Sequence, residues 1–438
     1  MRRLLKACRL PADSGVGQIC TLLNAGVDAD AEGEEGSTPL MCAAREGNLL
    51  GCAALLRRGA KVDTRSSDDD STALHLACLS GHLGAVDFLL THGANGDAVT
   101  TKGISPLAVA CGRRHVEVVR LLLERWYGAP ERGGLSAEKG AMSLYTACQL
   151  GDPEIVGLLL AAGASAVAAY DGWATPLFIA CLKGHQGIVE LLMASANAKE
   201  INGEDITHPL YVACQNGSVG IVELLLRHPR AGVDLPTEKG GTAMLVACQE
   251  GRLAIVELLL SEGSDVVNRN VTPQGHTPLH VACKAGRLGI VEVLLRQIQE
   301  QNRQGGGICI GITRIVNRQN KAGATPLNTA VDCGHAGICK LMLSHGAEVG
   351  SHVMSRESVA FLDGVRADAA AEAAAAAEAE AAAASEATPK CEMCGGATRK
   401  KCAGCRAAFY CSDTCQHAHW QDHKQQCRAR AAEAAKTQ

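Results

Sequence analysis

Apolar and polar positions recur along residues 37–350 with a period close to 33 residues. Each unit opens with an apolar segment that begins Thr-Pro-Leu, passes through a glycine, and closes with a Val-Glu-Leu-Leu-Leu segment whose apolar residues have helical spacing. The pattern predicts two short helices per unit. Since one unit cannot bury its own apolar face, we expect neighbouring units to stack around a continuous core. The threonine position of the unit falls at Thr38, Thr72, Ser105, Met142, Thr175, His208, Thr242, Thr277 and Thr325.

Residues at both ends of the first helix have local physical roles. A threonine hydroxyl accepts from the free N–H groups of a helix start, and a proline at the first helical position loses no hydrogen bond. A glycine suits the left-handed conformation that often ends a helix. Repeat three carries Gly112 and His115 instead, and repeat four has Met142 at the threonine position, so we expect altered turns there. The expected cap glycines are Gly47, Gly81, Gly151, Gly184, Gly217, Gly251 and Gly286.

These units resemble ankyrin repeats. The fragments at 72–95 and 277–295 carry the T-[PA]-L-H-x-A pattern at the ankyrin period. The resemblance implies a mainly α fold, an ankyrin-repeat α-solenoid of about nine repeats with short β-hairpin loops over residues 37–350. We expect residues 1–36 to form an atypical N-terminal cap.

Repeats eight and nine are separated by an insertion at residues 299–320, which we interpret as a loop lengthened at a hairpin tip. Its three glycines at 305–307 suggest a phosphate-binding loop, but no Gly-Lys-Ser/Thr follows them. Residues 351–390 form a linker, and its alanine-rich part at 367–387 carries five acids and lacks an apolar stripe. Alanine favours helix, so we expect a spacer that is semi-rigid or partly disordered.

The bulk composition excludes some functions. The chain has 438 residues, enough for two or more domains. Its formal net charge of −4 lacks the positive excess that is typical of nucleic-acid-binding proteins. No uncharged apolar stretch approaches the roughly 18 residues of a membrane span, so we expect no membrane association.

Seven cysteines recur at one position of the repeat, three residues after the histidine of Thr-Pro-Leu-His. Packed helices lie about 8–10 Å apart, whereas a disulfide needs Cα atoms at roughly 4.4–6.8 Å. We therefore expect small buried thiols and a reducing compartment, the cytoplasm, the nucleus or both. These register cysteines are Cys78, Cys111, Cys148, Cys181, Cys214, Cys248 and Cys283.

The C-terminal segment 391–427 concentrates metal-ligating residues at regular spacings. Eight of them suffice for two closed tetrahedral zinc sites, which are structural and not catalytic. An interleaved grouping puts 16 and 17 residues between the two ligand pairs of each site, inside the roughly 15–20 residues typical of double-knuckle sites. The spacing therefore predicts one zinc on Cys391, Cys394, Cys411 and Cys415, and the other on Cys402, Cys405, His423 and Cys427.

The same segment resembles the MYND zinc fingers, through its two Cys-x-x-Cys knuckles, the Tyr410-Cys411-Ser412 step, Cys415-Gln416, Trp420 and the closing His423-x-x-x-Cys427. The resemblance implies two structural Zn²⁺ per chain. It also implies a groove for a short proline-containing peptide beside Gln416 and Trp420. The tail at 428–438 carries no function that we can derive.

Tyr145, Phe178 and Tyr211 occupy the histidine position of three successive repeats. Two interpretations stay open, packing within the array or a stripe that contacts a partner.

These features predict a monomeric, non-enzymatic adaptor. By resemblance, the array would bind a protein and the finger a proline-containing peptide. A lysine methyltransferase, in which MYND fingers also occur, needs a catalytic domain for which the repeats and the linker leave no room. The alternative is a nucleic-acid-associated or transcriptional co-regulator, for which the finger's net charge of +2 is weak support; we regard nucleic acid as an unlikely partner.

Overall fold

The computed structural model describes most of the repeat region and little of the C-terminal segment. It divides the chain into two compact units, Met1–Val353 and Met354–Gln438. The described residues are 2–10, 12–33, 36–129, 134–172, 174–195, 203–228, 231–238, 240–265, 271–304, 312–386, 400–401 and 409–410.

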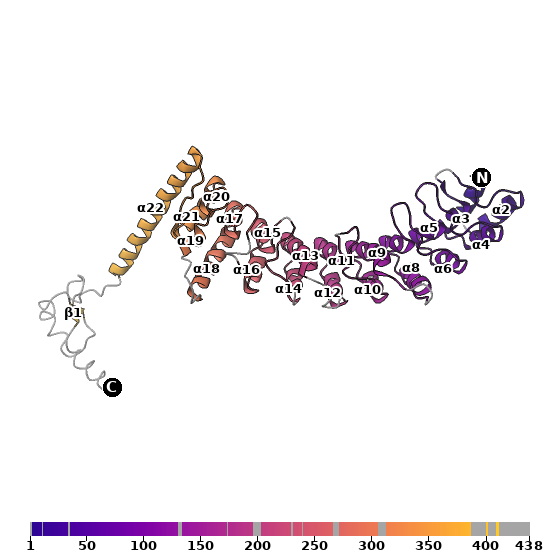
Figure 1. The fold of residues 1–438 in the computed structure, drawn as a ribbon, viewed down its shortest axis with the longest axis horizontal. Coiled ribbons are helices and arrows are strands. Elements are labelled where there is room, and N and C mark those ends of the chain that lie inside the picture. The colour runs from indigo at the N-terminus through magenta and orange to yellow at the C-terminus, as the bar shows by residue number, and fades with distance from the viewer. Residues whose placement is uncertain are drawn as a thin grey trace, which may run out of the picture. The chain divides into compact units, whose positions relative to one another are not determined.

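The first unit consists of helix pairs that follow one another in chain order (Figure 1). The N-terminal pair is α1 (Arg2–Cys8) and α2 (Ala12–Asn24). The first helices of the nine repeats are α3 (Pro39–Arg45), α5 (Ala73–Ser80), α7 (Pro106–Arg113), α9 (Ala137–Leu150), α11 (Pro176–Lys183), α13 (Gly203–Asn216), α15 (Ala243–Glu250), α17 (Pro278–Lys284) and α20 (Pro326–Asp332). The second helices are α4 (Leu49–Arg57), α6 (Leu83–Thr91), α8 (Val116–Leu122), α10 (Pro153–Ala161), α12 (Gln186–Ser195), α14 (Val219–Leu226), α16 (Leu253–Ser261), α18 (Leu288–Gln304) and α21 (Ala336–Ser344).

Each first helix packs against the first helix of the next repeat and against its own second helix. Figure 1 shows the second helices along one side of the row of first helices. In repeat two, Leu74 and Ala77 of α5 meet Val86 and Leu89 of α6, and all four are fully buried. Burial of one such leucine stabilises the fold by about 1.5–3 kcal/mol, and the same positions are apolar in every repeat. The predicted continuous core is confirmed.

The predicted caps are present at both ends of the first helices. Thr175, for example, begins α11 by accepting from the N–H of Phe178 at 3.1 Å. All seven expected glycines have positive φ, between 70° and 83°. In repeat three Arg114 takes this conformation itself, at φ 60°, and its side chain pairs with Asp152 at 3.1 Å. That ion pair joins repeats three and four, so the altered turn adds a contact between repeats.

Two first helices begin earlier than the repeat pattern predicts. Met142 offers no capping hydroxyl, and α9 instead begins after Ser136, whose side chain accepts from the N–H of Lys139 at 3.3 Å. In repeat six α13 likewise begins at Gly203 and contains Pro209. A helix continues toward its N-terminus until a residue satisfies its free N–H groups, which explains the extra turns of α9.

In the insertion before repeat nine, residues 299–304 and 312–316 are helical, so their interpretation as part of a lengthened hairpin tip was wrong. Helix α18 runs to Gln304, and a short helix α19 (Ile312–Val316) follows. The sequence after Leu295 is rich in glutamine, arginine and glutamate, which are good helix formers. The three glycines at 305–307 lie outside the described residues. Repeat three also contains a π-helical turn, η2 (Leu123–Tyr127), with Trp126 and Tyr127 buried.

The described loops between repeats contain hairpin turns that are closed by backbone hydrogen bonds. The N–H of Ser66 donates to the Ser71 carbonyl at 2.8 Å, and Thr237 does the same to Gly241 at 2.8 Å. Tyr170 and Ala174 form an isolated antiparallel bridge. We call these turns the hairpin tips.

The second unit contains a long helix, α22 (Arg356–Glu386), and two short strands. The alanine-rich spacer is therefore helical through Glu386. Strand β1 (Lys400–Lys401) pairs antiparallel with β2 (Phe409–Tyr410), with Lys400 opposite Tyr410. None of the helices in the described residues is long and apolar enough to cross a membrane.

Candidate protein-interaction surfaces

One position of the first helix lies at the junction with the next repeat and varies in chemistry along the array. It is the residue three after the threonine position, and we call it the slot. The slot holds Met41, His75, Ala108, Tyr145, Phe178, Tyr211, Leu245, His280 and Asn328.

The slot histidines tie one repeat to the next. The N–H of Thr277 donates to Nδ1 of His280 at 3.2 Å, so this imidazole carries its proton on Nε2. Nε2 then donates to the carbonyl of Ala324, in the next hairpin tip, at 3.0 Å. His75 makes the same contacts with Thr72 and Ile104. Burial lowers the pKa of His280 to about 4, because the apolar surroundings disfavour the charged imidazolium.

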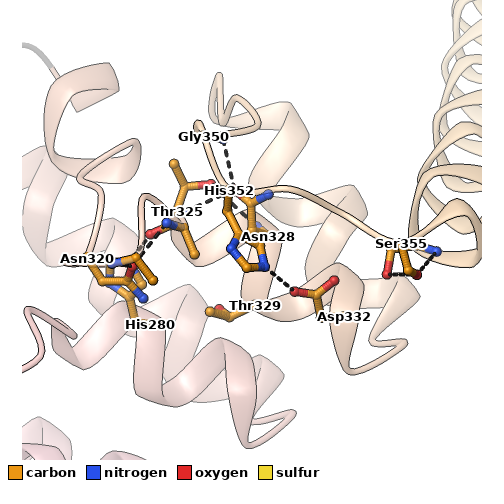
Figure 2. Close-up of polar contacts among 12 residues, drawn as sticks. His280, Asn320, Thr325, Asn328, Thr329, Asp332, Gly350, His352 and Ser355 are labelled. Atoms are coloured by element: carbon orange, nitrogen blue, oxygen red, sulfur yellow. Dashed lines mark hydrogen bonds and ion pairs between the residues drawn. The ribbon is translucent and has the colours of Figure 1, made fainter.

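Asn328 occupies the slot of the last repeat and connects to the segment that follows the array (Figure 2). Its Oδ1 accepts from the N–H of Thr325 at 3.0 Å and from the N–H of Gly350 at 2.8 Å. His352 pairs with Asp332 at 3.7 Å in the same region. Residues 350–352 thus take the place of a tenth hairpin tip.

The three slot aromatics are half-buried, and two of them pack on the next hairpin tip. The rings of Tyr145 and Tyr170 lie 5.5 Å apart between centroids. A Cβ placed on Gly241 would lie 2.9 Å from Cε2 of Tyr211, so that ring rests directly on the backbone of the tip. Packing within the array therefore accounts for one face of these two rings, and the exposed part stays available to a partner.

All seven register cysteines are fully buried, as predicted. The cysteines in the described part of the chain are free thiols. Burial raises the pKa of Cys148 to about 12, because an apolar environment disfavours the thiolate. A thiol reacts as its thiolate, so these groups are poor nucleophiles and poor metal ligands.

Thiol labelling checks this assignment. At pH 8, N-ethylmaleimide is expected to modify the exposed Cys333 quickly while the register cysteines stay unmodified until urea unfolds the array. Peptide mass mapping at successive times gives the order of labelling. Early modification of Cys148, or a native disulfide between register cysteines, would contradict the buried-thiol assignment and the reducing compartment together.

The side of the array formed by the first helices and the hairpin tips, which we call the inner face, also contains a groove that the sequence did not reveal. The first helices α15 and α17 and the hairpin tip at 272–276 enclose a depression of ≈ 550 Å³. It is lined by Gln249, Thr272, Gln274, His276, Val281, Lys284 and Ala285. These side chains come from two repeats, and no motif within one repeat could have indicated them.

The predicted zinc ligands and the peptide contacts Gln416 and Trp420 lie outside the described residues. Strand β1 ends directly before Cys402, and β2 ends directly before Cys411. In the described part of the chain, no cluster of three or more histidine, cysteine or acidic residues could hold a metal ion.

Comparison with known families decides the identity of the array. A family model for ankyrin repeats matches six overlapping stretches, 4–100, 93–170, 132–205, 177–270, 210–305 and 268–352. The chain belongs to the ankyrin-repeat family. A second family model, for the MYND finger, matches residues 391–427 of this ankyrin-repeat protein. The predicted combination of an ankyrin-repeat α-solenoid with a MYND-type zinc finger is thereby confirmed.

Several known proteins are similar to part of this ankyrin-repeat protein. A transient receptor potential cation channel subfamily A member 1 homolog of Caenorhabditis elegans is 33% identical over 24% of this chain and 8% of its own length. A putative ankyrin repeat protein of fowlpox virus is 31% identical over 32% of this chain and 42% of its own length. The crystal structure of the human ASB11 ankyrin repeat domain aligns at 27% identity and a TM-score of 0.43, covering 52% of this chain and 99% of that chain. The matched stretches thus span less than half of each curated relative.

Proposed function

We propose that this ankyrin-repeat protein is a non-enzymatic adaptor with two separate binding modules. Ankyrin repeats and the MYND finger are both interaction modules. The supporting observation is the row of slot aromatics in repeats four to six, Tyr145, Phe178 and Tyr211, which are half-buried while the other slot residues are buried. The inter-repeat contacts described above hold these side chains in place, so a partner meets a preorganised surface.

In this proposal the zinc finger binds a short proline-containing peptide. The two zinc ions are structural, with all ligand positions filled by protein, so they supply folding energy and no reaction chemistry. Trp420 lies between the ligand pairs Cys411/Cys415 and His423/Cys427, and Gln416 follows Cys415 directly. Metal binding at both sides would fix the Trp420 side chain without using it as a ligand. Aromatic side chains held in this way dominate binding energy at many interfaces.

The protein is further proposed to act as a monomer in the cytoplasm, the nucleus or both. Support comes from the buried register cysteines, which pack as thiols and need no oxidising compartment.

Replacing Trp420 tests the peptide site. Trp420→Ala is expected to retain both zinc ions and to weaken binding by roughly 2 kcal/mol or more, the cost of removing an aromatic hot spot. Binding is measured by fluorescence polarisation with labelled octapeptides that carry a fixed central proline. Zinc is measured on the same sample by elemental analysis.

The control for this experiment is Trp420→Phe, which keeps an aromatic ring and should retain most of the affinity. Loss of zinc from Trp420→Ala would make Trp420 a core residue of the finger instead. Unchanged peptide binding with zinc retained would remove Trp420 from the site. Tight binding of unrelated duplex DNA, weakened by salt, would favour the nucleic-acid alternative.

The array is tested separately from the finger. Residues 1–353 form a compact unit of the structure and serve as one bait, with the full chain as the other. We expect the array alone to retain a protein from cell extract that Trp420→Ala in the full chain also retains. If neither bait retained a protein above background, the adaptor function of the array would be contradicted.

A further inference from the structure

The lining of the groove between α15 and α17 carries a positive charge and no negative one. Its lining residues include Lys284 and no aspartate or glutamate. Lys284 is exposed, and no carboxylate of the described residues lies within ion-pair distance of its ammonium group. Arg287 lies beside the groove, where its Nε donates to the carbonyl of Gln249 at 3.3 Å. The nearby acid Glu250 accepts from the side-chain amide of Gln249 at 3.3 Å.

The repeats directly before the groove lack a charge at this position. In repeats two to seven, the position equivalent to Lys284 carries an uncharged residue, whereas repeat one has Arg45 there. The uncharged residues are Leu79, Gly112, Gln149, Leu182, Gln215 and Gln249. After repeat one, the positive charge at this position returns at the repeat where the groove opens.

His276, one of the residues that line the groove, carries a hydrogen-bond donor. Oδ1 of Asn320 accepts from the N–H groups of Ala322 at 2.9 Å and Ala324 at 3.0 Å, which identifies its other side-chain atom as the amide nitrogen. That nitrogen lies 3.4 Å from Nε2 of His276 and donates to it. A neutral imidazole whose Nε2 accepts carries its proton on Nδ1, so His276 offers an N–H donor.

The neutral form of His276 is favoured by its surroundings. Burial and the nearby Lys284 charge both lower its pKa, since each disfavours the imidazolium. A bound anion would oppose the effect of Lys284 and raise this pKa.

We propose that this groove binds an acidic side chain of the partner protein, with its carboxylate on Lys284 and on the donors of His276 and Gln274. Val281 and Ala285 form the apolar part of the lining and would contact a small apolar residue next to that acid. A carboxylate accepts several hydrogen bonds at once and gains most from donors that carry charge. This inference rests on the proposed adaptor function and adds the chemical class of ligand to it.

The probes are acetylated, amidated, fluorescent octapeptides with one fixed central residue and random small or apolar flanks. Four sets carry Asp, Asn, Lys or phosphoserine, and a fifth ends in a free carboxylate with no acidic side chain. The full-length, zinc-loaded protein is expected to bind the Asp set about tenfold more tightly than the Asn set, the size of a charge-assisted contact. It should also bind the Asp set more tightly than the set with a free C-terminus.

The variants are Lys284→Gln, Lys284→Glu and the matched control Lys183→Gln. Lys183 is also exposed and also lies at the end of a first helix, α11, outside the groove. Lys284→Gln should abolish the preference for Asp over Asn, and Lys284→Glu should reverse it toward the Lys set. Lys183→Gln should retain it. In NMR spectra, the pKa of His276 should rise when the Asp set binds to the wild-type protein.

Several outcomes would overturn the proposal. If Lys284→Gln kept the preference for the Asp set over the Asn set, the groove would be excluded as the carboxylate site. The same conclusion would follow if the wild-type protein showed no such preference. Tighter binding of the free C-terminus or of phosphoserine than of Asp would make the groove a site for another anion. A tighter Lys284-dependent complex with single-stranded DNA would make the groove a nucleic-acid site. Each of these results can occur while the array still captures its partner from extract, so loss of the groove and loss of the adaptor function are distinguishable.

Discussion

Two zinc ions per chain are expected in the purified protein, and none in residues 1–353. The eight predicted ligands between Cys391 and Cys427 would fill two tetrahedral sites, and structural zinc contributes about 10–16 kcal/mol to the folding of such small fingers. Elemental analysis of both chains gives the stoichiometry. One zinc or none in the full chain would contradict the two-site assignment, and zinc in residues 1–353 would place a site in the array.

Replacing one ligand should have a large local effect. Cys394→Ser is expected to release zinc and unfold the finger, since metal binding supplies most of its folding energy. The matched control is Cys333→Ser, which changes an exposed thiol outside the finger and should leave the zinc content unchanged. The interleaved pairing is tested with ¹¹³Cd in place of zinc. Heteronuclear NMR should connect Cys394 and Cys411 to the same cadmium, whereas a shared cadmium for Cys394 and Cys402 would require sequential pairing.

Mild acid is expected to destabilise the array through the slot histidines. His280 has a pKa of about 4 in the folded protein and about 6.5 when unfolded, so the unfolded state binds the proton more readily. The contribution of His280 to the free energy of unfolding is fully present above pH 6.5 and is lost as the pH falls toward 4. Between pH 7 and pH 5, the loss amounts to roughly 2 kcal/mol, and His75, whose pKa is lowered for the same reason, acts in the same direction.

The variant that isolates this effect is His280→Asn. Asn328 shows that asparagine fits the slot and that its Oδ1 accepts from the same backbone N–H as the imidazole Nδ1. Urea unfolding at pH 7 and pH 5 should therefore show a smaller difference in the variant than in the wild type. His92→Asn, at an exposed histidine, should leave the difference unchanged. An equal pH dependence in all three proteins would exclude His280 as an acid-sensitive group.

Features encoded within one repeat could be predicted from the sequence. The threonine caps, the left-handed glycines and the buried cysteines all follow from a residue and its near neighbours along the chain. The early start of α9 depends on where the next capping residue occurs, since Ser136 supplies the cap that Met142 lacks. Residues 299–304 were predicted wrongly as part of a loop, because the helix formers between Leu295 and Gln304 were not weighed.

The sequence by itself determined the period and the class of fold, and it predicts the eight zinc ligands. Only the tertiary structure decided what the slot residues do, since their partners lie about one repeat away. Tyr145 packs on Tyr170, and His280 bonds to Ala324. The same is true of the groove, where Gln249, His276 and Lys284 come together only when two repeats stack. Helix caps depend on neighbours along the chain, whereas a binding surface depends on which side chains the stacking of repeats brings together.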